Sequence, residues 1–245
     1  MHNYFSMRKL LVAACLWVPT LLSAQEALWL RYPSISPDGT SIVFGYQGNL
    51  YKVAATGGDA TPLTVGESHS MMPIWSRDGQ SIAFANNRHG NFDVFVMPAN
   101  GGQATRLTYN SADDYPYDFT ADNNSVYFGS ARQAPAASVR FPSIRLFQNV
   151  YQVSTNGGRA QLVSAAGMAH AKLSPNGKQL VFQDRKGYED AWRKHHTSSV
   201  TRDIWIYDFE KKNYLALTNE EIEHREPVFA QDGQSVFYLS EKDGT

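Results

Sequence analysis

One ten-residue phrase recurs along the chain and restricts its fold more than any other feature. Each copy contains a short apolar stretch, a polar turn and a second run in which apolar side chains alternate. The copies read ISPDGTSIVF (35–44), WSRDGQSIAF (75–84), FTADNNSVYF (119–128), LSPNGKQLVF (173–182) and FAQDGQSVFY (229–238). Alternation around an Asp-Gly or Asn-Gly turn is typical of a β-hairpin. We therefore expect one hairpin at each copy.

The spacing of the copies predicts how the hairpins assemble. Successive turns lie 40 to 56 residues apart, and each of the first three is followed by a Gly-Gly turn, as in TGGDATPLT (56–64), NGGQATRLT (100–108) and NGGRAQLVS (156–164). Four short strands per repeat of this length are the pattern of an all-β propeller with four-stranded antiparallel blades. The predicted blades span about 31–66, 71–110, 114–165 and 168–219, with a partial fifth at 225–245. The aromatic residues expected in the core between blades are Phe44, Phe84, Phe128, Phe182 and Phe237.

The N-terminus differs from the rest of the chain. Met7-Arg8-Lys9 precedes the apolar stretch LLVAACLWVPTLLSA (10–24), which ends in small residues. A basic start, an apolar middle and a small-residue exit predict a signal peptide at 1–24, cleaved before Gln25, and hence an exported protein, periplasmic or extracellular. An uncleaved membrane anchor and a lipid anchor at Cys15 are the alternatives. The apolar stretch is short for a membrane span, and few apolar residues precede Cys15.

Composition and motifs limit the chemistry that this chain could perform. The formal net charge of −1 argues against nucleic acid as the main partner. The sequence contains no G-x-S-x-G elbow, H-E-x-x-H motif or P-loop. Ser68, His69 and Ser70 are adjacent, but neighbouring residues on a strand point apart. We therefore predict no catalytic residue, no metal site and no cofactor, and we expect the Asp-Gly pairs to be turn formers.

Two insertions between the second and third strands of blades 3 and 4 are the candidate contact regions. They span 131–148 and 184–201 and should emerge at the same end of the propeller. Such long loops in a compact domain are commonly functional. The candidate peptide or domain contacts in them are Arg140, Arg145, Trp192, Arg193, His195 and His196. A structural role is the competing interpretation, in which Asp190, Arg193, Arg202 and Asp203 pair among themselves and hold the second insertion.

The repeated phrase resembles the WD40-like repeat of TolB-type and tricorn-type propellers, and the resemblance covers nearly all of the chain after residue 24. The stretch YEDAWRKHHTSSVTRDIWIYD (188–208) resembles the first propeller of tricorn-like serine peptidases, which are related to C-terminal-processing proteases. This resemblance implies PDZ and peptidase domains downstream, and peptides or unfolded polypeptide as partners of the propeller. The alternatives are a non-enzymatic TolB-like protein-binding propeller and a propeller fused to another hydrolase.

The resemblance also implies a longer protein. Propellers of this kind usually have six or more blades, whereas about four and a half are present here. The last residues, SEKDGT (240–245), stop where blade 5 would begin its third strand. We expect an incomplete ring over residues 25–245, and we expect its bare strands and faces to promote self-association, including homo-oligomers.

Overall fold

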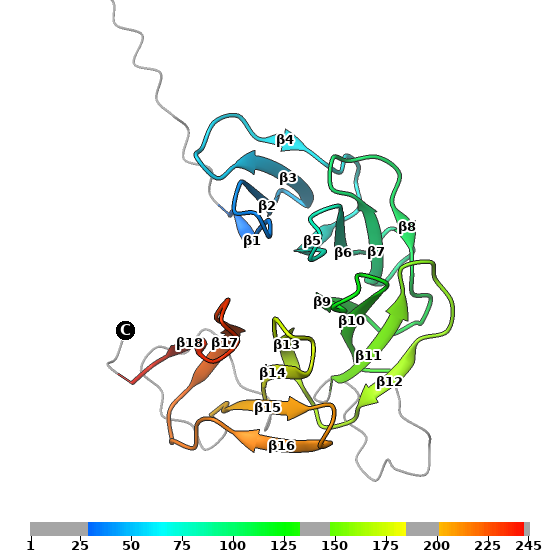
Figure 1. The fold of residues 1–245 in the computed structure, drawn as a ribbon. Helices are drawn as coiled ribbons and strands as arrows, with labels where there is room; N and C mark the ends of the chain where they lie inside the picture. Colours follow the sequence, from blue (N-terminus) through cyan, green and yellow to red (C-terminus); the bar gives the residue numbers. More distant parts are fainter. Residues whose placement is uncertain (1–28, 133–147, 185–200, 243–245) are drawn as a thin grey trace, which may run out of the picture.

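The chain forms an all-β arc of sheets. The computed structural model describes residues 29–132, 148–184 and 201–242. Within these residues the strands make four four-stranded sheets and one two-stranded sheet, and every paired neighbour is antiparallel. Figure 1 shows the five sheets following one another around a common centre, with their first strands nearest that centre. This confirms the predicted β-propeller of four-stranded antiparallel blades. None of the described residues belongs to a helix that could cross a membrane.

Each sheet is a meander whose strands run outward in chain order. The first sheet comprises β1 (Arg31–Ile35), β2 (Ser41–Tyr46), β3 (Asn49–Ala54) and β4 (Thr61–Pro62). The second comprises β5 (Ser70–Trp75), β6 (Ser81–Asn86), β7 (Asp93–Pro98) and β8 (Thr105–Arg106). The third comprises β9 (Asp114–Phe119), β10 (Ser125–Ser130), β11 (Asn149–Ser154) and β12 (Gln161–Ser164). The fourth comprises β13 (Ala169–Leu173), β14 (Gln179–Gln183), β15 (Ile204–Asp208) and β16 (Asn213–Ala216). The fifth comprises β17 (His224–Phe229) and β18 (Val236–Ser240).

The turn after each of the first four inner strands is closed by one repeated hydrogen bond. In the first turn the Ser36 hydroxyl donates to Asp38 Oδ1 at 2.5 Å, and that same oxygen accepts the backbone N–H of Thr40 at 3.0 Å. Gly39 has a φ of +73°, which a residue without a Cβ adopts at little cost. The equivalent hydroxyl bonds are Ser76 to Asp78, Thr120 to Asp122 and Ser174 to Asn176. The Asp-Gly pairs therefore serve as turn formers.

A second repeated contact links the two outermost strands in three of the sheets. In the second sheet the Thr108 hydroxyl accepts the backbone N–H of Val94 at 2.9 Å and lies 3.4 Å from Asp93 Oδ1. Thr64 makes the same pair of contacts with Leu50 and Asn49, and Thr218 makes it with Ile204 and Asp203. The final Thr of the phrases ATPLT and ATRLT thus joins the end of the outermost strand to the start of its neighbour.

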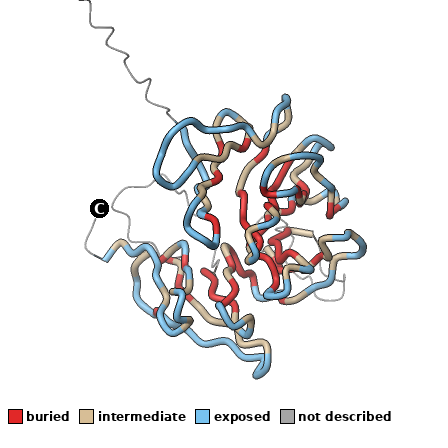
Figure 2. The backbone as a smooth tube through the Cα atoms, turned by 45° about the horizontal axis from the view of Figure 1, so that its top comes forward, coloured by how far each residue is buried: buried red, intermediate tan, exposed pale blue. Residues whose placement is uncertain are grey.

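The hydrophobic core consists of three clusters, one between each pair of neighbouring four-stranded sheets. Val43 and Leu50 of the first sheet pack with Phe84 and Phe95 of the second. The second and third sheets share a cluster that includes Val94 and Phe128, and the third and fourth share one with Leu173 and Leu180. Figure 2 shows the buried segments concentrated on the inner strands of the middle sheets.

Phe84, Phe128 and Phe182 are buried as predicted, but the prediction for Phe237 was wrong. Phe237 is 64% exposed, because no described sheet covers the face of the fifth sheet on which it lies. Tyr238 lies eight residues after Ala230, the first residue of its turn, just as Phe84 lies eight residues after Ser76. The centroids of the Tyr238 and His224 rings are 5.2 Å apart. Phe237 lies on the opposite face of the strand, at the position equivalent to Ala83 and Tyr127, which are buried against the next sheet.

The two ends of the arc carry apolar faces that no described sheet covers. On the first sheet this face includes Phe44, which is half-buried, and Ile35, which is 60% exposed. On the fifth sheet Val228 and Phe237 are paired across the hairpin on the exposed face, beside Leu239. Uncovered faces of this kind are surfaces for association.

Candidate functional site

A cavity of about 380 Å³ lies where the innermost strands of all five sheets meet. Each innermost strand contributes side chains to its wall. They include Tyr32 from β1, Met72 from β5, Tyr117 from β9, His170 from β13 and Glu226 from β17. The cavity therefore exists only because the five sheets are arranged around one centre, and each sheet supplies one part of the wall.

A repeated backbone irregularity directs residues of four of these strands into the cavity. Tyr32, Met72, His170 and Glu226 have φ values between +52° and +53°, in the left-handed region that non-glycine residues seldom occupy. Each lies within a shift of strand register, which is the position of a β-bulge. A bulge re-aims the side chain that it carries, and all four side chains line the cavity.

The third sheet has no left-handed residue at this position, because a proline stands there. Its strand β9 also shifts register. Pro116 stands four residues before Thr120, whose hydroxyl closes the turn, and the left-handed residues occupy this same position in the other sheets. The pyrrolidine ring holds φ near −65°, so Pro116 cannot adopt the left-handed conformation. Pro116 and the neighbouring Tyr117 both line the cavity.

Polar groups from the third, fourth and fifth sheets meet on one side of the cavity. His170 Nδ1 lies 3.1 Å from Glu226 Oε2, and the His170 ring stacks on Tyr117 with centroids 6.4 Å apart. The Lys172 ammonium donates to the carbonyl oxygen of Tyr117 at 2.7 Å. The hydrogen bond from His170 and the nearby positive charges hold the pKa of Glu226 below its usual value. The wall thus combines an ionised carboxylate, cations and aromatic faces.

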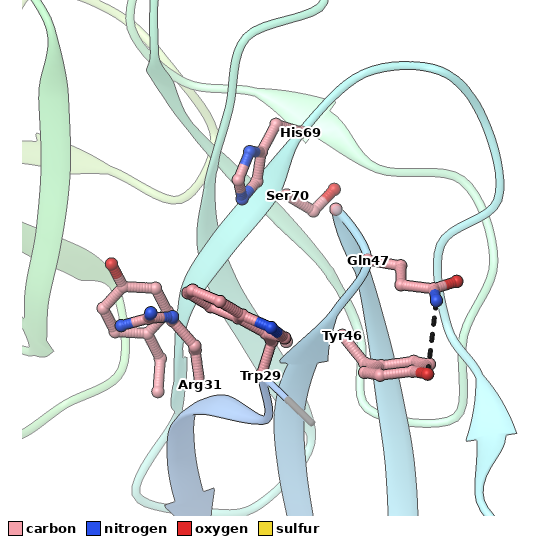
Figure 3. A pocket seen from close by; sticks show the side chains of 9 residues that line it. Trp29, Arg31, Tyr46, Gln47, His69 and Ser70 are labelled. Carbon is pink, nitrogen blue, oxygen red and sulfur yellow. Dashed lines mark hydrogen bonds between the residues drawn. The ribbon is translucent and has the colours of Figure 1, made fainter. Parts of the chain in front are cut away.

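A second cavity of about 290 Å³ adjoins the first through Tyr32, which lines both. It lies beside the tight turn between β2 and β3, where Gln47 and Gly48 both have positive φ. Figure 3 shows Trp29 and Arg31 facing this space from the start of β1, with His69 above them and Tyr46 on the other side. The second cavity therefore lies at the end of the propeller where the connections between second and third strands emerge.

The residues around these cavities do not form a nucleophile–base pair. The hydroxyl oxygens of Ser68 and Ser70 both accept hydrogen bonds from the Asn86 amide, at 3.0 and 2.9 Å, and the His69 ring contacts Phe92. No hydrogen bond between a serine and a histidine occurs in the part of the chain that the structure describes. The same part contains no cluster of three or more histidine, cysteine or acidic side chains able to hold a metal ion.

The predicted contact residues of the two insertions lie outside the described residues. They are Arg140, Arg145, Trp192, Arg193, His195 and His196. The pairing proposed among Asp190, Arg193, Arg202 and Asp203 stays a prediction, because Asp190 and Arg193 lie outside the described residues. Arg202 pairs with Glu223, which precedes β17, whereas Asp203 accepts a hydrogen bond from Thr218. Arg202 therefore joins the fourth sheet to the fifth.

Sequence reasoning did not identify the four left-handed residues that line the central cavity. A signal was present, because each stands four residues before the first residue of the repeated turn. Tyr32, Met72 and Glu226 are followed by proline in the short phrases that precede the turns. Aligning the repeats on the turn would have placed Tyr32, Met72, His170 and Glu226 in one column.

Comparison with known proteins gives the family. A Tricorn protease homolog 1 from Streptomyces coelicolor is 24% identical over 218 residues, which cover 89% of this chain and 19% of the relative. An uncharacterized protein from Agrobacterium fabrum is 29% identical over 156 residues, 60% of this chain and 48% of the relative. The chain thus spans about half or less of the length of these relatives.

Solved structures share the fold. The crystal structure of TolB from Acinetobacter baumannii superposes with a TM-score of 0.61 at 18% identity, covering 88% of this chain and 55% of that one. The tricorn protease crystal structure gives a TM-score of 0.52 at 17% identity, covering 86% of this chain and 20% of that one. The model of the tricorn protease N-terminal β-propeller domain matches residues 27–245. The chain therefore belongs to the family of tricorn protease N-terminal β-propeller domains.

Proposed function

We propose that this chain is the N-terminal propeller region of an exported tricorn-like serine peptidase. In this proposal the propeller docks or admits peptides and unfolded polypeptide. PDZ and peptidase domains elsewhere in the protein supply the chemistry. The family match over residues 27–245 supports the parent class. Export rests on the signal-peptide pattern at 1–24.

The observation that carries the docking role is the central cavity formed by all five innermost strands. Its volume of about 380 Å³ is in the range of ligand-binding cavities, which run from about 300 to 1,000 Å³. Its wall offers the exposed aromatic ring of Tyr32, a carboxylate on Glu226 and an ammonium on Lys172. Such a lining accepts a peptide segment through ring contacts and hydrogen bonds and requires no one side-chain sequence.

Filling the cavity tests this role. Ser34 lines the cavity and is partly buried, so the substitution Ser34→Trp places an indole in the space a peptide would occupy. We expect a labelled flexible peptide to bind the full chain saturably, measured by fluorescence anisotropy, and to bind the Ser34→Trp variant about tenfold or more weakly. The control Gln103→Trp adds the same side chain at an exposed turn between β7 and β8 and should leave binding unchanged.

Two results would contradict the docking role. One is equal peptide binding by wild type and Ser34→Trp when both unfold at the same temperature. The other is no binding of any flexible peptide to the wild-type chain. Export is tested separately, because the mature protein recovered outside the cytoplasm should begin at Gln25.

A further inference from the structure

The second cavity contains a cation without an acidic partner. Arg31 lies at the start of β1, and its guanidinium stacks over the Trp29 ring at 5.0 Å from the centroid. Among the described residues, no carboxylate lies within ion-pair distance of Arg31, and none lines this cavity. In contrast, Arg106 is paired with buried Asp93, and Arg132 with buried Asp114. Within the described part of the chain, no acidic side chain thus competes with an external anion for Arg31.

A second nitrogen group lies in the same space. The backbone N–H of His69 is held by Asn87 Oδ1 at 2.7 Å, and the imidazole contacts Phe92 with ring centroids 5.9 Å apart. No described residue forms a hydrogen bond with the imidazole nitrogens of His69. Figure 3 shows the His69 ring on the same side of the cavity as Arg31 and Trp29. The cavity thus offers a guanidinium and an imidazole, both able to donate hydrogen bonds to an anion.

The rest of the wall is aromatic and open. Trp29 is 70% exposed, and Tyr46 stands across the cavity, where its hydroxyl oxygen accepts a hydrogen bond from Gln47 at 3.2 Å. Among the described residues, three of the eight non-glycine residues with positive φ line this cavity: Trp29, Tyr32 and Gln47. Residues in such sparsely populated conformations cluster at ligand-binding sites.

We propose that this second cavity binds a carboxylate that lies beside an apolar or aromatic side chain of a peptide. Arg31 holds the carboxylate through its planar pair of N–H donors, and His69 supplies a further donor. The adjacent side chain of the ligand stacks on Trp29 or Tyr46. Tyr32 lines both cavities, so a peptide anchored here can also contact the wall of the central cavity. The inference rests on the proposed docking function and assigns an anchor point to the docked chain.

The carboxylate has two sources in a polypeptide, which the experiment separates. One is the free C-terminus of a peptide that ends in an apolar residue, and the other is an internal acidic side chain beside such a residue. Three fluorescein-labelled peptides are compared by anisotropy with the full chain. The first ends in Phe with a free carboxylate, the second is its C-terminal amide, and the third is an amide with Glu directly before Phe.

Variants at Arg31 assign the binding to the cavity. Arg31→Gln removes the charge, and Arg31→Lys keeps the charge without the planar fork. Arg159→Gln is the matched control, because Arg159 is exposed on the turn between β11 and β12, at the opposite end of the propeller. Because Arg31→Gln removes a charge-assisted hydrogen bond, we expect it to weaken the carboxylate-dependent binding by about tenfold or more. Arg31→Lys should lie between Arg31→Gln and wild type.

The outcomes separate this inference from the docking function. Tighter binding of the free acid than of its amide, abolished by Arg31→Gln but not by Arg159→Gln, supports a chain terminus. Arg31-dependent binding of the Glu-Phe amide supports a side-chain carboxylate. If all three peptides bind equally well to wild type and Arg31→Gln, the inference is wrong and the docking function stands. If no peptide binds the wild-type chain, both fail.

Discussion

His170 Nδ1 lies 3.1 Å from Glu226 Oε2, and this contact joins the innermost strands of the fourth and fifth sheets. Both residues have the same left-handed backbone conformation, at equivalent positions of two repeats. The bulge that occurs in each repeat therefore brings two side chains together that are distant in the sequence. The result is a polar pair at the wall of the central cavity.

The first prediction concerns the protonation of this pair. The hydrogen bond and charge of His170 are the main causes that lower the pKa of Glu226, so His170→Ala should raise that pKa toward the ordinary value of 4.5. An NMR titration of the Glu226 side-chain carboxyl carbon measures the change. His69→Ala, at the second cavity, should leave the titration unchanged. An identical Glu226 pKa in wild type and His170→Ala would show that the contact does not persist in solution.

The second prediction concerns the left-handed backbone. At an ordinary strand position glycine is less stable than alanine by about 0.5–1 kcal/mol. Met72 has a φ of +52°, where a Cβ costs roughly 1–2 kcal/mol. We therefore expect Met72→Gly to be more stable than Met72→Ala, the reverse of the usual order, in chemical denaturation. Ala83→Gly in the middle of β6 is the control and should be destabilising. The usual order at position 72 would contradict the left-handed assignment.

The fold could be predicted from the sequence because the residues that determine each hairpin lie close together and recur in each repeat. The Ser-x-Asp-Gly turns fix each hairpin, and four strands per repeat then leave few architectures open. The assignment of Phe237 to the core failed because no described sheet covers its face of the fifth sheet, whereas the equivalent Ala83 is covered by the third sheet. Tyr238, which is the equivalent of Phe84 when counted from the turn, is 41% exposed as well.

The cavities were harder to predict than the fold. A β-bulge depends on pairing between strands, so the sequence around Met72 or His170 does not by itself show a positive φ. The second cavity brings Arg31 near His69, and these residues belong to different sheets. An unpaired arginine can be identified only when its surroundings are known. The candidate contact residues were predicted in the long insertions because of the length of those loops, whereas the two cavities lie at short strands with β-bulges.

The third prediction concerns acid stability. The Ser76 hydroxyl and the Gln80 backbone N–H hold the pKa of Asp78 below its usual value of 3.8. A carboxyl whose pKa is lowered by folding stabilises the folded state fully above its unfolded pKa, and this stabilisation is lost as the pH falls through the folded pKa. Asp78→Asn should therefore show a smaller loss of stability than wild type when the pH is lowered from 5 to below 3.

The turn of the fourth sheet already has an asparagine, Asn176, at the position of Asp78. It accepts the Ser174 hydroxyl hydrogen bond at 2.7 Å in the equivalent turn of the fourth sheet, so an amide fits the position. Asp59→Asn, at an exposed position in the connection before β4, is the control and should follow the wild-type curve. Urea denaturation at each pH gives the free energies of unfolding. Parallel curves for wild type and Asp78→Asn would refute the role of the turn carboxylate.

The fourth prediction concerns the threonine that closes the second sheet. Thr108 is buried, and its hydroxyl bonds the Val94 N–H and contacts Asp93. Thr108→Val keeps the shape but leaves these buried groups without their partner, which should lower the free energy of unfolding by about 1–3 kcal/mol. Thr108→Ser keeps the hydroxyl and should lose less. Equal losses for the two variants would show that packing, and not the hydroxyl, determines the effect.

Photo-crosslinking tests the central claim, docking at the inner strands, most directly. A flexible peptide with a benzophenone side chain at its centre is bound to the full chain and irradiated, and the modified residues are identified by mass spectrometry. Docking in the central cavity predicts modification of β1, β5, β9, β13 or β17, at residues such as Tyr32, Met72 and His170. Modification confined to the outer strands β4, β8, β12 and β16, with none on the inner strands, would contradict it.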